Sequence, residues 1–191
     1  RFPSAFCGVF GHKPSFGIVP STGYLDHANG GDTEADINVI GPITRSADDL
    51  ELLLRLLVRK HVTLAPGKAP RGLRVAAWLD DATFTVDREV QVRLEETVNA
   101  IEKSGIAVDR TARPNIDLAE ATEVGGALVG AATSWVRENS ISHKQWLLLD
   151  QRRQHMRRQW ENFFDQFDVI LMPVAFVPPF DHQHRGQFEN R

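Results

Sequence analysis

Side chains that can act as nucleophiles or bases lie close together near the start of the chain. Ser4 and Ser15 carry hydroxyls, Cys7 carries the only thiol of the chain, and Lys13 is spaced to serve a Ser-Lys pair. Lys13 directly precedes Pro14, and Ser15 begins a turn, so we expect no such dyad. Cys7 is predicted to be a small, buried packing residue rather than a thiol nucleophile. We therefore assign no catalytic residue within these 191 residues.

A second group with ligand chemistry is the "DHQH" stretch at 181–184. On an extended segment His182 and His184 would point to the same side, as a metal site needs. Two histidines on a surface tail are usually solvated, so we predict no metal site and no cofactor.

Four arginines lie on one predicted helix, in "RRQHMRRQ" at 152–159. The chain has 22 Lys and Arg against 25 Asp and Glu, a formal net charge of −3. This balance disfavours nucleic acid and anionic membranes as partners. We expect the arginines to form a solvated face or to contact an acidic subunit. The longest apolar runs are too short to span a bilayer.

Strand and helix patterns alternate in the later sequence. The stretch 73–79 is predicted to be a buried strand, 86–105 a helix that ends at Gly105, and 106–110 a short strand. This order predicts a right-handed parallel crossover. A small-residue helix at 117–139, a helix at 143–167 and a buried strand at 168–174 complete the pattern. Periodicity thus predicts an α/β protein.

The earlier sequence is rich in Gly and Pro. It predicts a short helix near 3–7 and a short strand near 8–12. Ser46 and Asp49 fit a capping box that begins a helix with an apolar leucine face. The segment 60–72 is predicted to be a linker. The glycines of the 117–139 helix are expected to allow close backbone approach to a neighbour.

The single cysteine excludes an internal disulfide, which makes a reducing compartment the default. No basic segment followed by an apolar stretch begins the chain, so no signal peptide is evident. We therefore expect a cytoplasmic protein. Because the chain does not begin with Met, we expect further residues to precede Arg1.

Two specific segments lie in the early part of the chain: "RFPSAFCGVFGHKPSFGIVP" and, later, "IGPITRSADDL". These resemble the amidase signature family of serine amide hydrolases, and "FDVILMPV" at 167–174 resembles a strand found late in that family. Arg1, Pro3 and Ser4 match the last residues of the family hallmark. The resemblance implies part of a mixed-sheet α/β/α fold, with helices flanking a partial sheet, and makes 1–191 a partial amidase domain truncated at both ends.

The resemblance also implies a mechanism. The family's nucleophilic serine would lie two residues ahead of Arg1, and its cis-configured serine and catalytic lysine further upstream. A serine hydroxyl needs a base before it can attack, and the family relays its proton through the bridging serine to a lysine kept neutral by desolvation. We therefore expect the 191 residues alone to hydrolyse no amide.

Several residues would support such a centre. Arg1, Pro3, Ser4 and Cys7 are expected to form the scaffold of the nucleophile turn. Arg45 in "GPITR" is expected to join this scaffold through a structural ion pair. Two aromatic residues are the candidates for contact with a small-molecule amide substrate: Phe6 and Trp135.

Two further functions stay open. The first is the amidotransferase A subunit of a tRNA-dependent complex, although the stretch between "VP" and "IGP", Ser21 to Val39, is longer than we expect of it. The second is a non-catalytic fragment that binds a partner through strand edges. Parallel strands need cover on both faces and neighbours on both edges. We therefore expect a homodimer or a swapped assembly, unless further segments provide that cover.

Overall fold

The computed structural model describes residues 1–24, 37–134 and 140–181. Its elements follow in the order α1 (Phe2–Phe6), β1 (Phe10–Gly11), β2 (Ile43–Thr44), α2 (Ala47–Leu57), the 3-10 turn η1 (Pro70–Gly72), β3 (Val75–Ala77), α3 (Arg88–Lys103), β4 (Val108–Asp109), α4 (Leu118–Ala132), α5 (His143–Phe164) and β5 (Val169–Leu171).

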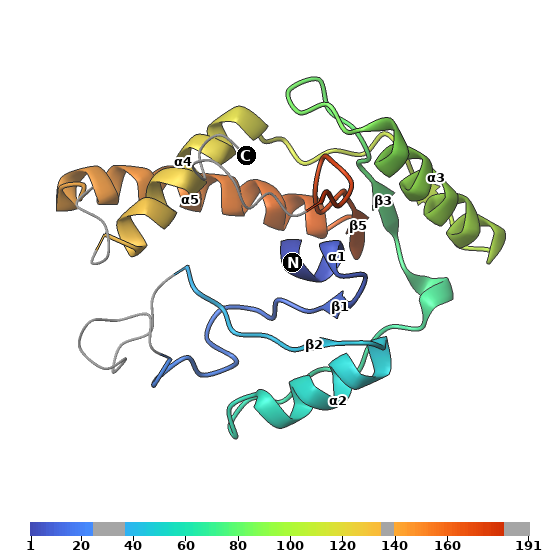
Figure 1. Cartoon of the computed structure of the whole chain (residues 1–191), viewed down its shortest axis with the longest axis horizontal. Helices are drawn as coiled ribbons and strands as arrows, with labels where there is room; N and C mark the ends of the chain where they lie inside the picture. Colours follow the sequence, from blue (N-terminus) through green and yellow to red (C-terminus); the bar gives the residue numbers. More distant parts are fainter. Residues whose placement is uncertain (25–36, 135–139, 182–191) are drawn as a thin grey trace.

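The later elements form a parallel sheet with strand order β4-β3-β5. Val75 pairs with Val108 of β4 and with Val169 of β5. Helix α3 lies on one side of the strands, whereas α4 and α5 lie on the other (Figure 1). All three residues of β3 are buried because the strand has a neighbour on each edge. The predicted parallel crossover is confirmed.

Helix α3 lies within the predicted range 86–105 and ends just before Gly105, as predicted. The Asp87 carboxylate accepts a hydrogen bond from the Glu89 amide and so caps the helix. Val98 is fully buried on the apolar face. Gly105 has a φ of 89°, a left-handed conformation that ends the helix and turns the chain toward β4.

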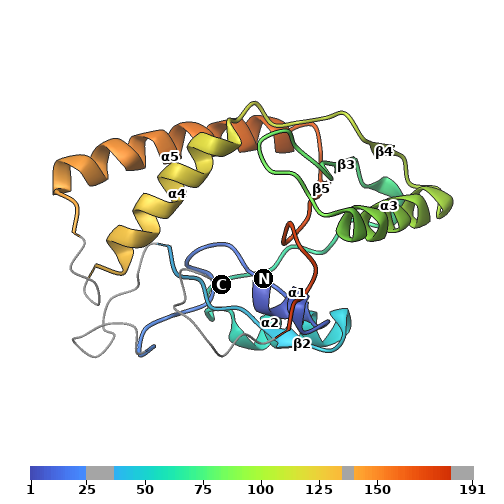
Figure 2. The same cartoon turned by 45° about the horizontal axis from the view of Figure 1, so that its top comes forward.

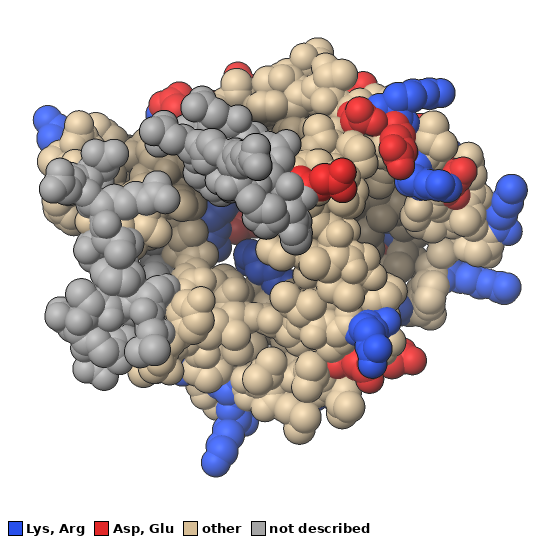
Figure 3. All heavy atoms as spheres, viewed as in Figure 1, with Lys and Arg blue, Asp and Glu red and all other residues tan. Residues whose placement is uncertain are grey.

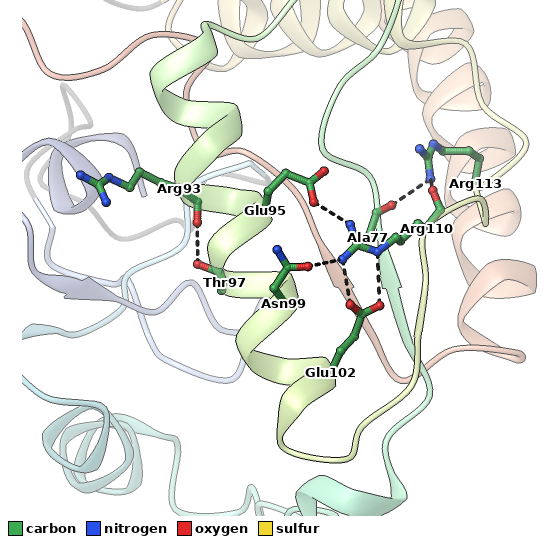
Figure 4. Close-up of polar contacts among 8 residues, drawn as sticks. All are labelled: Ala77, Arg93, Glu95, Thr97, Asn99, Glu102, Arg110 and Arg113. Atoms are coloured by element: carbon green, nitrogen blue, oxygen red, sulfur yellow. Dashed lines mark hydrogen bonds and ion pairs between the residues drawn. The ribbon is translucent and has the colours of Figure 1, made fainter.

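An arginine ties the end of β4 back to α3. The Arg110 guanidinium donates to Glu95 at 2.6 Å, to Asn99 at 2.9 Å and to Glu102 at 2.8 Å (Figure 4). These contacts run along one side of the helix and hold α3 beside the strand that follows it. The Arg113 guanidinium reaches the Ala77 carbonyl oxygen at 3.0 Å and thereby connects the same loop to β3.

Helices α4 and α5 pack as an antiparallel pair that projects beyond the sheet, as Figure 2 shows. Val124 and Leu128 of α4 are buried. At the surface, Arg152 of α5 pairs with Glu120 and Glu123 of α4, each at 2.9 Å. Both the apolar contact and the ion pairs therefore join these helices.

The glycines of α4 do not play the predicted part. A Cβ atom added at Gly125, Gly126 or Gly130 would meet no described atom within 4 Å. The expected close backbone approach is therefore absent among the described residues, because α5 packs on the face that carries Val124 and Leu128.

The earlier elements include a second, two-stranded sheet. Strands β1 and β2 pair antiparallel, Phe10 with Thr44 and Gly11 with Ile43. The Ser46 hydroxyl accepts from the Asp49 amide at 3.1 Å, which confirms the predicted cap of α2. The leucine face of α2 is only partly covered: the described residues fully bury none of the helix, Leu50 and Leu54 are half-buried, and Leu53 and Leu57 are 36% and 39% exposed.

The segment predicted as a linker, 60–72, includes the turn η1 and otherwise has no helix or strand. Its Lys68 ammonium pairs with Asp168 at 2.5 Å, just ahead of β5.

Within the described ranges, no helix is both long and apolar enough to cross a membrane.

Candidate active-site region

Helix α1 fixes the position of Arg1. The Ala5 amide donates to the Arg1 carbonyl oxygen at 3.0 Å, and Arg1 is the N-cap residue of the helix. Pro3 fits the first turn because it has no amide hydrogen to satisfy there. The Cys7 amide donates to the Pro3 carbonyl oxygen at 3.0 Å and closes the helix. The Arg1 backbone is thus held rigidly against α1.

Ser4 joins α1 to β1. This residue is 4% exposed, and a Cβ atom on Gly11 would collide with its hydroxyl. The Val9 amide donates to the Ser4 carbonyl oxygen at 3.0 Å. Ser4 therefore packs α1 on the first strand, whereas its Oγ atom is buried without a hydrogen-bond partner.

Arg1 lies at the wall of the largest cavity described, about 960 Å³ in volume, which we call the β5 groove. Most of its lining is apolar and comes from α1, α5 and the strand β5 with its continuation. The residues are Arg1, Phe2, Pro3, Trp160, Phe164, Ile170, Met172, Pro173 and Val174. The exposed fractions of Phe2 and Phe164 are 48% and 43%, large values for aromatic rings beside a cavity.

The sequence did not identify the α5 and β5 residues of this groove. The "DVILMPV" segment indicated a buried strand, but not that Ile170 and Met172, late in the chain, lie beside Arg1 at its start. Only the three-dimensional fold brings residues of α1, α5 and β5 to the same groove. The signal that points toward them is the resemblance of this strand to one found late in the family.

Arg1 also lines a second cavity, of about 380 Å³, on the side of β1 and β2. We call it the basic pocket, because Lys13 and His12 line it too. The Lys13 ammonium donates to the Pro14 carbonyl oxygen at 3.1 Å. Burial, and then the nearby charge of Arg1, lower the pKa of Lys13.

The comparisons with known proteins fit this arrangement. A sequence model of the family described as Amidase matches residues 1–146. The chain belongs to the amidase family. It is 30% identical over 156 residues to the A subunit of the glutamyl-tRNA(Gln) amidotransferase of Pseudothermotoga lettingae, a match that covers 75% of this chain and 32% of that protein. The corresponding protein of Salinibacter ruber is 27% identical over 156 residues, covering 75% and 29%.

This amidase-family chain also has a similar solved structure, a fatty acid amide hydrolase. The TM-score is 0.68 at 19% identity, over 94% of this chain and 38% of that chain. The likeness shows the fold, so the predicted amidase signature fold with flanking helices is confirmed. The chain spans about a third of the length of the curated relatives it matches.

Phe6, a predicted substrate-contact residue of the amidase-family chain, is not among the lining residues of the two cavities at Arg1. The Phe6 ring lies tilted against that of Phe2, with ring centroids 4.5 Å apart, and packs edge-on to Phe180 at 5.4 Å. It lines a separate apolar cavity of about 230 Å³ with Val90 and Leu94 of α3. Trp135, the other predicted contact, lies outside the described residues.

Two scaffold residues differ from expectation. Cys7 is exposed rather than buried, because it follows the last turn of α1 and β1 does not cover it. Arg45 is also exposed, and within the described part of the chain it makes no ion pair. No hydrogen bond joins Lys13 to Ser4 or Ser15 in that part either. His182 and His184 lie outside it.

Proposed function

We propose that this chain is part of an amidase that hydrolyses a small carboxamide to a carboxylate and ammonia. The observation that carries the proposal is the position of Arg1 at the wall of the β5 groove. In the family pattern the nucleophilic serine lies two residues ahead of this arginine. Two residues of chain reach at most about 7 Å, so that serine would lie beside the groove.

The residues of this chain would then bind and orient the amide. The rings of Phe2, Trp160 and Phe164 and the side chains of β5 give the groove an apolar wall, which a bound amide would cover and so shield from water. A drier site strengthens the interaction of an attacking oxygen with the hydrogen-bond donors around it. Helix α1 holds the turn from which the serine would project, and a rigid turn keeps the attacking oxygen in reach of the carbonyl carbon.

The chemistry itself would come from residues outside 1–191. A lysine kept neutral by desolvation would take the serine proton through a bridging serine in a cis peptide. The serine oxygen would attack the amide carbon, the C–N bond would break as the nitrogen gains the proton, and water would release the acid from the serine. We therefore infer that these 191 residues have no activity alone, and we assign no nucleic-acid or membrane partner.

An alternative is the amidotransferase A subunit of a tRNA-dependent complex. The names of the two curated relatives above favour it. The stretch from Ser21 to Val39 speaks against it, since we expect a shorter segment there. Co-purification with tRNA and with a partner subunit would support this alternative. A non-catalytic interaction fragment is the third candidate, and the poorly covered leucine face of α2 is the observation that favours it.

The test uses a longer chain that contains residues 1–191 and the hallmark ahead of Arg1. We expect this chain to release ammonia from small carboxamides, and the 191 residues alone to release none. Changing the serine two residues ahead of Arg1 to alanine should abolish the release. Ammonia release that survives this substitution would contradict the proposed mechanism, and a longer chain without serine and lysine in the hallmark would refute the assignment.

A further inference from the structure

The basic pocket gathers positive charge that the described chain does not neutralise. It lies between α1, β1 and the segment that leads into β2. Its lining residues are Arg1, Ser4, Gly11, His12, Lys13, Ile37, Asn38, Val39, Gly41, Pro42 and Ile43. No Asp or Glu is among them. Figure 3 shows a hollow near the centre of this face, where Figure 1 places the N-terminus, with basic side chains and a partly hidden acidic one inside it.

Other cationic side chains of the molecule are paired with carboxylates. Arg110 contacts two carboxylates, those of Glu95 and Glu102. Arg152 likewise contacts those of Glu120 and Glu123. In the described ranges, Arg1 and Lys13 have no carboxylate partner, and the one hydrogen bond of the Lys13 ammonium goes to the carbonyl oxygen of the next residue. Two unpaired cations that face one cavity repel each other until an anion enters.

A second observation points to a missing partner at the same place. The Ser4 Oγ atom is the one side-chain polar atom that the described residues bury without a hydrogen bond. Buried hydroxyls nearly always have a partner, and an exception often marks a water or ion that belongs there. Ser4 is one of the lining residues of the basic pocket, so its unsatisfied hydroxyl lies just behind the wall of this pocket, where Gly11 covers it.

The other lining residues indicate what kind of anion fits. Ile37, Val39 and Ile43 supply aliphatic surface, and Pro42 beside them has no amide hydrogen to donate. Sites for phosphate typically present several backbone N–H groups. A carboxylate on a short aliphatic stem suits this pocket better, because its oxygens can face the cations while its methylene groups contact the apolar wall.

We propose that the basic pocket binds an aliphatic carboxylate, held between the Arg1 guanidinium and the Lys13 ammonium. The carboxylate belongs either to a free acid or to an Asp or Glu side chain from another part of a longer chain. The proposal concerns binding alone and does not depend on amide hydrolysis.

The test titrates the 191-residue chain with butyrate at constant ionic strength, followed by NMR. The neutral isostere butyramide and inorganic phosphate serve as control ligands. We expect saturable binding of butyrate, weaker binding of both controls, and a rise in the pKa of the Lys13 ammonium when butyrate binds. Each substitution, Lys13→Gln or Arg1→Gln, removes one charged hydrogen bond to the carboxylate of butyrate. Each should therefore weaken butyrate binding about tenfold. The exposed Lys144→Gln is the matched control and should bind as the wild type does.

A longer chain distinguishes the two sources. If a side chain fills the pocket, the longer chain will not bind butyrate, and Lys13→Gln will lower its Tm more than that of the 191-residue chain. If a free acid is the ligand, both chains will bind butyrate. Equal binding of butyrate and butyramide, or binding unchanged by Lys13→Gln, would overturn the proposal. The proposal would also be overturned if neither chain binds butyrate and Lys13→Gln lowers the Tm of both chains equally.

Discussion

The Asp168 carboxylate holds Arg74 at the start of the parallel sheet, although 94 residues separate the two. It accepts from the Arg74 amide at 2.9 Å and from the guanidinium at 3.1 Å. The Lys68 ammonium adds a contact at 2.5 Å. The Asp168 side chain is 12% exposed, so these donors largely replace water. The interaction fixes the entries of β3 and β5 side by side, and β5 forms a wall of the groove at Arg1.

The first prediction follows from this carboxylate. Hydrogen bonds from Arg74 and then from Lys68 hold the pKa of Asp168 well below its usual range. A lowered pKa in the folded state stabilises the protein above the unfolded value of about 3.9, and this contribution is lost as the pH falls below it. Because the folded-state pKa lies far below the unfolded value, the loss is gradual. Asp168→Asn should therefore lower Tm clearly at pH 7, and the Tm difference should begin to shrink below about pH 4 and be moderately smaller at pH 3.

Thermal unfolding of wild type and Asp168→Asn across this pH range is the measurement. The exposed Glu161→Gln removes the same charge from the end of α5 and is the matched control. A Tm difference for Asp168→Asn that stays constant from pH 7 to pH 3 would show that its charge is not what holds Arg74.

The second prediction concerns two glycines at which substitution by alanine should change the free energy of unfolding in opposite directions. Gly125 lies exposed inside α4 with open space around it, so alanine there should raise the free energy of unfolding by about 0.5–1 kcal/mol. Gly105 has a left-handed backbone at the end of α3, so alanine there should lower it by about 1–2 kcal/mol. Denaturant titration measures both. A loss of stability for Gly125→Ala would mean that a neighbour covers this face of α4.

The third prediction tests the contact that joins β1 to β2. A Cβ atom at Gly41 would collide with the His12 carbonyl oxygen, so the two segments approach as closely as only glycine allows. Gly41→Ala should lower the free energy of unfolding by about 1–3 kcal/mol. Gly67→Ala, where nothing lies within 4 Å, is the matched control and should change it little. Equal effects of the two substitutions would contradict the close approach.

Sequence reasoning succeeds for the elements whose signals are local. Helix α3 was predictable from its 3.6-residue apolar period, with Asp87 before it and Gly105 after it. Its two flanking strands were predictable from short apolar runs. The pairing of β2 with β1 was not predicted. Both strands are very short, and their register depends on Gly41 meeting His12, which lies far from it in the sequence. Contacts of that range leave no periodic trace in the sequence.

The site was predictable only in part, for the same reason. The hallmark residues identified Arg1, but its neighbours Met172 and Trp160 come from distant elements. Cys7 was expected to be buried because small thiols usually are, yet it follows the last turn of the short helix α1 and stays exposed. The glycines of α4 predicted close packing, but composition alone does not say which face of a helix meets its neighbour.

The fourth prediction concerns self-association. Strands β4 and β5 are the edges of the described sheet, and Leu52 and Leu56 of α2 are 57% and 72% exposed. Exposed strand edges and leucines favour contact with another chain. We expect light scattering to find concentration-dependent dimers of the 191-residue chain, and Leu52→Lys with Leu56→Lys to weaken them. A monomer at all concentrations would contradict a homodimer.

We infer above all that Arg1 and the β5 groove support a nucleophile that lies outside residues 1–191. The most direct measurement is labelling with a serine-directed phosphonate, with the modified residue mapped by mass spectrometry. We predict that the 191-residue chain takes up no label, and that a longer chain is labelled on the serine two residues ahead of Arg1. A label on Ser4, Ser15 or any other residue of the present chain would contradict the account.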